Sequence, residues 1–184
     1  MSRMCGGLPD YLAPDLSILF VGINPGLRSS EVGHHYAGPS NRFWKLLFDV
    51  GLVPYPMTCQ DDGRLLDYGY GLTNLVAKPT AGIQDLVKQD FLDGRHVLLA
   101  KIEQYQPALV AVLGISVARV LFPPVISNVS RKRLAASAIQ TGLQSELLAG
   151  VRVFVLPNPS GRNAHYSYQD MKRLFGELND VKEG

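Results

Sequence analysis

The stretch SILFVGINPG, residues 17–26, joins an apolar run to a sharp turn. Its first six residues are nearly all apolar, which predicts a strand over residues 17–22 that is covered on both faces. Pro25 fixes φ and Gly26 accepts a positive φ, so the chain is expected to turn directly after this strand. Asn24 therefore lies at the mouth of the strand, where its amide either supports the turn or acts on a ligand.

Apolar runs and helical patterns alternate along the rest of the chain. Further strands are predicted over residues 107–114, 151–156 and, with a weaker pattern, 69–76. Helices are predicted over residues 40–52, which begin with a capping Ser40 or Asn41, and over residues 94–105, 116–122 and 167–181. This alternation predicts a single three-layer α/β/α domain with a central, mainly parallel sheet over residues 15–184, after a flexible lead-in at residues 1–14.

The composition is that of a globular chain. Of the 184 residues, 46% are apolar and 18% are charged, which excludes the disordered class. The apolar runs are too short to span a bilayer, and the N-terminal residues lack the apolar core of a signal peptide. We therefore expect a cytoplasmic protein without membrane contacts, and a monomer. Cys5 and Cys59 lack C-x-x-C spacing, so neither a zinc site nor a disulfide framework is indicated.

Positive charge is concentrated in one part of the chain. Residues 115–174 hold eight Lys or Arg and two Asp or Glu, and they include the cluster Arg131–Arg133. A one-sided basic surface is typical of a protein that binds a polyanion, although a solvated face explains the same counts equally well.

A second turn repeats the arrangement around Asn24. The segment NPSG, residues 158–161, directly follows the predicted strand at residues 151–156. In parallel sheets, ligands bind at the carboxyl ends of the strands. The two Asn-Pro turns are therefore expected to face one crevice.

Four segments resemble, in the same order, the mismatch-specific uracil/thymine DNA glycosylases of the uracil-DNA glycosylase superfamily. They are GINPGLRSSEVGHHYAGPSNRFWKLLFDVGL at residues 22–52, YGYGLTNLVAKPT at 68–80, KIEQYQPALVAVLG at 101–114 and VLPNPSGRN at 155–163. The resemblance implies a glycosylase domain that flips a mispaired uracil, or another damaged pyrimidine, out of double-stranded DNA. It further implies hydrolysis of the N-glycosidic bond without a cofactor or a metal, which leaves an abasic site.

The resemblance also implies roles for residues near the first turn. Asn24 matches the residue that positions the attacking water, which suffices when departure of the base leads the reaction. Backbone N–H groups at Ile23 and Gly26 are expected to hold the base edge and to stabilise the departing anion. Tyr36 matches the aromatic residue that stacks on the flipped base. Asn74 matches a polar position near the base or the water, although it is equally well explained as a strand cap.

The second turn resembles the loop that fills the vacated base stack. Gly161 lets the backbone approach the duplex, Arg162 enters the gap, and Asn163 faces the widowed guanine. Ser29 and Ser160 are expected to contact DNA phosphates.

One segment departs from the family pattern and adds a carboxylate to a region that already has two. The segment FLDGR adds Asp93 to a region that already carries Asp85 and Asp90. Their simplest interpretation is a solvated helix lead-in. A carboxylate that reached the crevice would instead supply the general base that an amide cannot provide.

Other chemistries have weaker support. His34 and His35 have no third ligand at a suitable spacing, so a metal-dependent hydrolase is not indicated. Lys45 and Lys78 are expected at the surface, which argues against a lyase that forms a Schiff base. The remaining alternative is a non-catalytic module of the same fold that binds duplex DNA.

Overall fold

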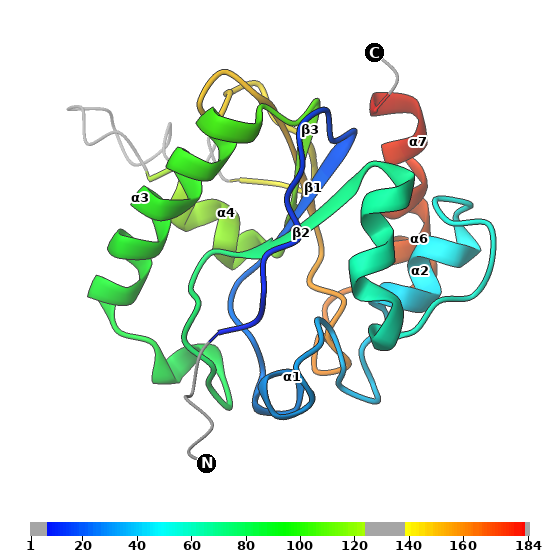
Figure 1. The fold of residues 1–184 in the computed structure, drawn as a ribbon, viewed down its shortest axis with the longest axis horizontal. Helices are drawn as coiled ribbons and strands as arrows, with labels where there is room; N and C mark the ends of the chain where they lie inside the picture. The colour runs from blue at the N-terminus through cyan, green and yellow to red at the C-terminus, as the bar shows by residue number, and fades with distance from the viewer. Residues whose placement is uncertain (1–6, 124–138, 183–184) are drawn as a thin grey trace.

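A five-stranded sheet forms the centre of the computed structural model, which describes residues 7–123 and 139–182 (Figure 1). Its strands are β1 (Ile18–Gly22), β2 (Tyr70–Asn74), β3 (Leu109–Leu113), β4 (Gly142–Leu143) and β5 (Arg152–Leu156). The strand order is β2-β1-β3-β5-β4, and all neighbouring pairs are parallel except β4 with β5. The mainly parallel α/β sheet expected from the apolar runs is confirmed.

Helices cover both faces of this sheet (Figure 1). One face packs against α2 (Phe43–Asp49), the 3-10 helix η1 (Cys59–Tyr68), α6 (Tyr168–Gly176) and α7 (Leu178–Val181), and the other packs against α3 (Lys88–Tyr105) and α4 (Ile115–Leu121). Successive side chains of a strand point to opposite faces, so Phe20 joins the first core and Val21 joins the second. Both cores are fully buried at these positions, which explains the continuous apolar runs.

Each of the four predicted ranges contains a helix, but the range 40–52 is helical only over α2, the range 167–181 is divided into α6 and α7, and several short elements were not predicted. These are α1 (Leu27–Val32), η1, η2 (Ile83–Asp85) and the edge strand β4. Helix α3 begins at Lys88, six residues before the predicted start at Gly94, because Asp90 caps it by accepting a hydrogen bond from Val87 N.

The segment before β1 contacts the sheet. Tyr11 forms an antiparallel bridge with Leu72, and Asp10 accepts a 2.6 Å hydrogen bond from Thr73 and forms a 2.6 Å ion pair with Lys101. These contacts involve residues that precede residue 15, the expected start of the domain. The domain boundary at residue 15 stays a prediction. Cys5 and the basic cluster Arg131–Arg133 lie outside the described residues.

Within residues 7–123 and 139–182, no helix combines the length and the apolar character that crossing a membrane requires. In the same ranges, no three His, Cys, Asp or Glu side chains gather in a way that could hold a metal ion.

Gly94 allows α3 to pack closely against the segment after β2. A Cβ on Gly94 would collide with the carbonyl oxygen of Leu75, whereas a Cβ on Gly176 in α6 would meet no atom within 4 Å. We therefore expect Gly94→Ala to lower the free energy of unfolding by about 1–3 kcal/mol, measured by urea denaturation. The matched variant Gly176→Ala should raise it by up to about 1 kcal/mol, and equal effects of both would contradict the packing argument.

Candidate active site

The carboxyl ends of four parallel strands lie along one edge of the sheet, on the side of α1 in Figure 1. Asn24 follows β1, Asn74 ends β2 and Asn158 follows β5. Only β3 separates β1 from β5, which sets the two turns about 10 Å apart in the sheet. The two Asn-Pro turns lie at the same edge as expected, and the expectation that they face one crevice stays a prediction.

The amide of Asn24 is held by the segment that follows β2. Its Nδ2 donates to the carbonyl oxygen of Lys78 and to Oγ1 of Thr80, both at 2.8 Å. A flipped amide would place Oδ1 of Asn24 against the carbonyl oxygen of Lys78, and two acceptors cannot bond to each other. The hydrogen bonds therefore show that Nδ2, not Oδ1, faces Lys78. Oδ1 of Asn24 accepts no hydrogen bond from the described residues, and it is free to accept one from water. Thr80 was not singled out from the sequence, although it ends the matching segment at residues 68–80.

Two backbone donors lie beside Asn24. The described residues offer no acceptor to the N–H groups of Ile23 and Gly26, whereas the carbonyl oxygen of Ile23 accepts from Val76 N at 2.8 Å. Both donors can therefore meet an acceptor brought in from solvent.

Tyr36 and Asn74 converge above Gly22. A Cβ on Gly22 would lie 3.0 Å from the Tyr36 hydroxyl and 2.6 Å from Oδ1 of Asn74. The Tyr36 ring packs on Phe43 with centroids 4.1 Å apart, and its enclosed hydroxyl finds no hydrogen-bond partner among the described residues. Burial raises the pKa of this hydroxyl, so it stays protonated and can donate.

The backbone N–H groups of the residues before and after Tyr36 donate to side chains. His35 N donates to Oδ2 of Asp62 at 3.0 Å, and Ala37 N donates to Oγ of Ser29 at 3.0 Å. Ser29 is only 7% exposed, which argues against the phosphate contact that we expected from it. That contact stays a prediction.

The loop after β5 is closed by its own polar groups. Oδ1 of Asn158 accepts from Ser160 N, and Nδ2 of Asn163 donates to the carbonyl oxygen of Asn158, each at 2.9 Å. Gly161 lies so close to Ser40 that a Cβ would collide with it. The loop is therefore a rigid support for the residue at its tip.

Arg162 is that exposed tip residue. Its Nη1 donates to the carbonyl oxygen of Ala81 at 3.0 Å, which links the loop after β5 to the segment after β2. Its backbone N donates to Oγ of Ser160 at 3.3 Å, so Ser160 supports the tip from below.

The three carboxylates near α3 are all engaged at the surface. Asp85 accepts from Gly82 N, and Asp93 accepts from Gln89 Nε2 at 2.7 Å. Asp90 accepts from Val87 N and from Lys78 Nζ, and these bonds hold the pKa of its carboxyl below the usual value. Because each of them serves a local cap or pair, none of the three is directed at Asn24.

The two lysines considered for Schiff-base chemistry are exposed. The Lys45 side chain is 65% exposed and pairs with Asp49, which raises the pKa of its amine, and Lys78 pairs with Asp90. A Schiff-base lysine needs the opposite shift, a lowered pKa.

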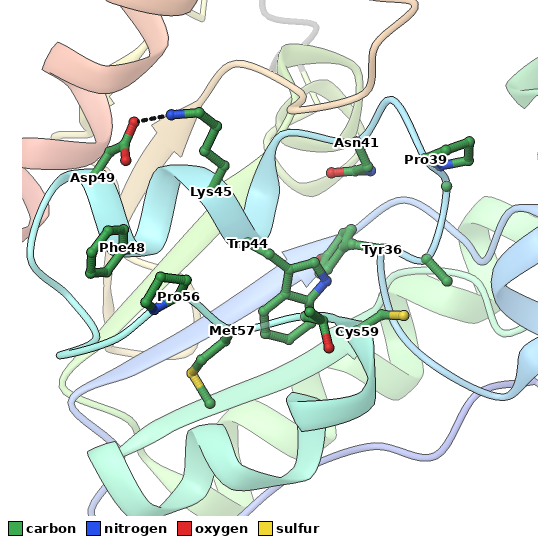
Figure 2. A pocket seen from close by; sticks show the side chains of 13 residues that line it. Tyr36, Pro39, Asn41, Trp44, Lys45, Phe48, Asp49, Pro56, Met57 and Cys59 are labelled. Atoms are coloured by element: carbon green, nitrogen blue, oxygen red, sulfur yellow. Dashed lines mark hydrogen bonds and ion pairs between the residues drawn. The ribbon is translucent and has the colours of Figure 1, made fainter.

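An apolar cavity of about 580 Å³ lies beside α2 (Figure 2). Pro39 lies at one end and the Lys45–Asp49 pair at the other, with Tyr36 and Trp44 between them. Asn24 does not line this cavity. Tyr36 therefore borders both this cavity and the space above Gly22, where Asn74 also lies.

Comparison with known proteins gives a family match over nearly the whole chain. Residues 9–180 match the model of the uracil DNA glycosylase superfamily. The fold is similar to a solution NMR structure of a Methanosarcina acetivorans protein described as a candidate uracil DNA glycosylase, with a TM-score of 0.60. The two chains are 18% identical, and the alignment covers 96% of this chain and 97% of the other. At that identity the structural match supports the fold alone.

His35 makes the stability of the domain depend on pH. The side chain is 1% exposed, its Nε2 lies 2.8 Å from the carbonyl oxygen of Pro9, and burial lowers the pKa of the ring. As the pH falls below about 6.5, the unfolded chain binds a proton before the folded chain does. We therefore expect a smaller free energy of unfolding at about pH 5.5 than at about pH 7.5.

The variant His35→Gln keeps an N–H donor for Pro9 and does not titrate, so it should reduce the difference between the two pH values. The exposed His96 on α3 provides the control, and His96→Gln should behave as the wild type. An unchanged pH dependence in His35→Gln would contradict the assignment.

Proposed function

The chain belongs to the uracil DNA glycosylase superfamily, and from that premise we propose that it removes uracil mispaired with guanine from double-stranded DNA. Membership indicates a DNA glycosylase that acts on uracil. The preference for a mismatch, the mechanism and the residue roles are our proposal, and thymine and other damaged pyrimidines are further substrates to be measured.

The geometry of Asn24 carries the proposal. Its Nδ2 is tied to Lys78 and Thr80, which leaves Oδ1 free to accept from an attacking water, and an amide is no strong base. Such a site suits a reaction in which the bond to the base breaks first and the sugar gains oxocarbenium character. The N–H groups of Ile23 and Gly26 would then stabilise the negative charge on the departing uracil.

Recognition of the base is assigned to Tyr36 and Asn74. Tyr36 is packed on Phe43 and can offer its remaining ring surface to an everted base. The amide of Asn74 has a donor and an acceptor, which match the carbonyl and N3–H groups of uracil.

We assign the loop after β5 to fill the gap that the everted base leaves in the duplex. Arg162 is exposed at the tip of a loop braced by Asn158 and Asn163, and it would replace the base in the stack. Its bond to Ala81 would open for this step. In this assignment Gly161 would let the backbone approach the duplex, Ser160 would donate to a phosphate, and Asn163 would face the orphaned guanine.

We infer a monofunctional enzyme. A lyase activity would require a lysine with a lowered pKa near the sugar, and both Lys45 and Lys78 are exposed and paired with carboxylates. The product is then an abasic site in an intact strand.

Replacing Asn24 tests the water-positioning role. On a labelled G·U duplex under single-turnover conditions, Asn24→Ala should slow base release about 10²- to 10⁴-fold, because the water loses its acceptor. Strand breaks should appear only after alkali treatment. The control is Gln104→Ala, which removes an exposed amide from α3. Full-speed release by Asn24→Ala would refute the role, and duplex binding by the wild type without any release would favour the non-catalytic module.

Replacing Arg162 tests the wedge. Arg162→Ala should weaken binding to a G·U duplex more than binding to a single strand, because only the duplex has a stack to fill. The control is Arg173→Ala on α6, where the arginine pairs with Glu177. Equal losses on both substrates, measured by fluorescence anisotropy, would make Arg162 a phosphate contact only.

A further inference from the structure

Tyr36 has a backbone conformation that its own side chain disfavours. Its φ is +53°, in the left-handed region that bulky residues rarely adopt. A residue in such a conformation persists only where its surroundings hold it, and such residues cluster at functional sites.

Three side chains from three different elements hold the peptide groups around Tyr36. The N–H of His35 donates to Asp62 in η1, and its carbonyl oxygen accepts from Trp44 Nε1 in α2 at 3.3 Å. On the other side, Ala37 N donates to Ser29 in α1. Trp44 and Ser29 therefore fix the two peptide planes that flank Tyr36, and Asp62 fixes the preceding plane, between His34 and His35.

Asp62 is the charged member of this set, and it is 2% exposed. Besides His35, its carboxylate accepts from the Tyr11 hydroxyl at 3.0 Å and from Gly63 N at 2.9 Å, and it lies 3.2 Å from Nδ1 of His34. Hydrogen bonds to a buried carboxylate are strong, and removing its charge leaves the donors around it poorly matched. Asp62 thus joins the N-terminal segment to the turn that carries Tyr36.

We propose that Asp62 is a positioning residue that acts through His35 to present the Tyr36 ring to an everted base. The inference rests on the proposed function, in which Tyr36 stacks on that base. Asp62 itself touches neither the base nor the water.

The test is a double-mutant cycle on single-turnover uracil release. Asp62→Asn keeps the shape of the side chain but places an NH₂ group among donors, so release should slow by up to about 100-fold through misplacement of the ring. In the Tyr36→Ala background the same change should have little effect, because the ring that Asp62 positions is absent. An equal slowing in both backgrounds would show a merely structural role and overturn the inference.

Two further variants keep the test decisive. Asp61→Asn is the matched control, because the neighbouring Asp61 caps η1 at Thr58 and should leave release unchanged. If Asp62→Asn does not fold, Tyr11→Phe removes one donor to Asp62 and should give a smaller loss with the same dependence on Tyr36. Lack of any base release by the wild type would refute the proposed function, whereas release without coupling between Asp62 and Tyr36 would refute this inference alone.

Discussion

The parallel pairing of β1 with β2 is the constraint on which the site depends. The pairing continues beyond the sheet, because the carbonyl oxygens of Gly22, Ile23 and Pro25 accept from the N–H groups of Leu75, Val76 and Thr80. These bonds bring the Asn24 amide to a carbonyl and a hydroxyl that lie more than fifty residues away in the chain. The orientation of the Asn24 amide then follows from the chemistry of its partners, since the Lys78 carbonyl can only accept and must therefore face Nδ2.

A second set of polar groups surrounds the turn that carries Tyr36, away from the amide of Asn24. The buried carboxylate of Asp62, the indole of Trp44 and the hydroxyl of Ser29 come from three elements and meet around one turn. Buried polar groups are costly unless they are fully bonded, so they specify one arrangement of the chain around them. Stability and the geometry of the site are therefore linked at this turn.

The sequence predicts the regular elements well, because strands buried on both faces and amphipathic helices leave clear periods. The 3-10 helix η1 follows neither period, so Asp62 was not singled out from the sequence. The early start of α3 was missed because Gly94 reads as a boundary, whereas it permits close packing on Leu75. Asn24, Tyr36 and Arg162 were identified through motifs, but the partners Thr80 and Ala81 belong to contacts over long sequence distances.

Both borders of the sheet are short or covered. Beyond β5 the sheet ends in β4, which has two residues, and beyond β2 the bridge to Tyr11 occupies Leu72. An uncovered border offers a row of free backbone donors and acceptors on which another chain can add a strand. In the described part of the chain, the Tyr11 bridge and the two-residue length of β4 therefore reduce the number of backbone groups that another copy could pair with at the sheet borders.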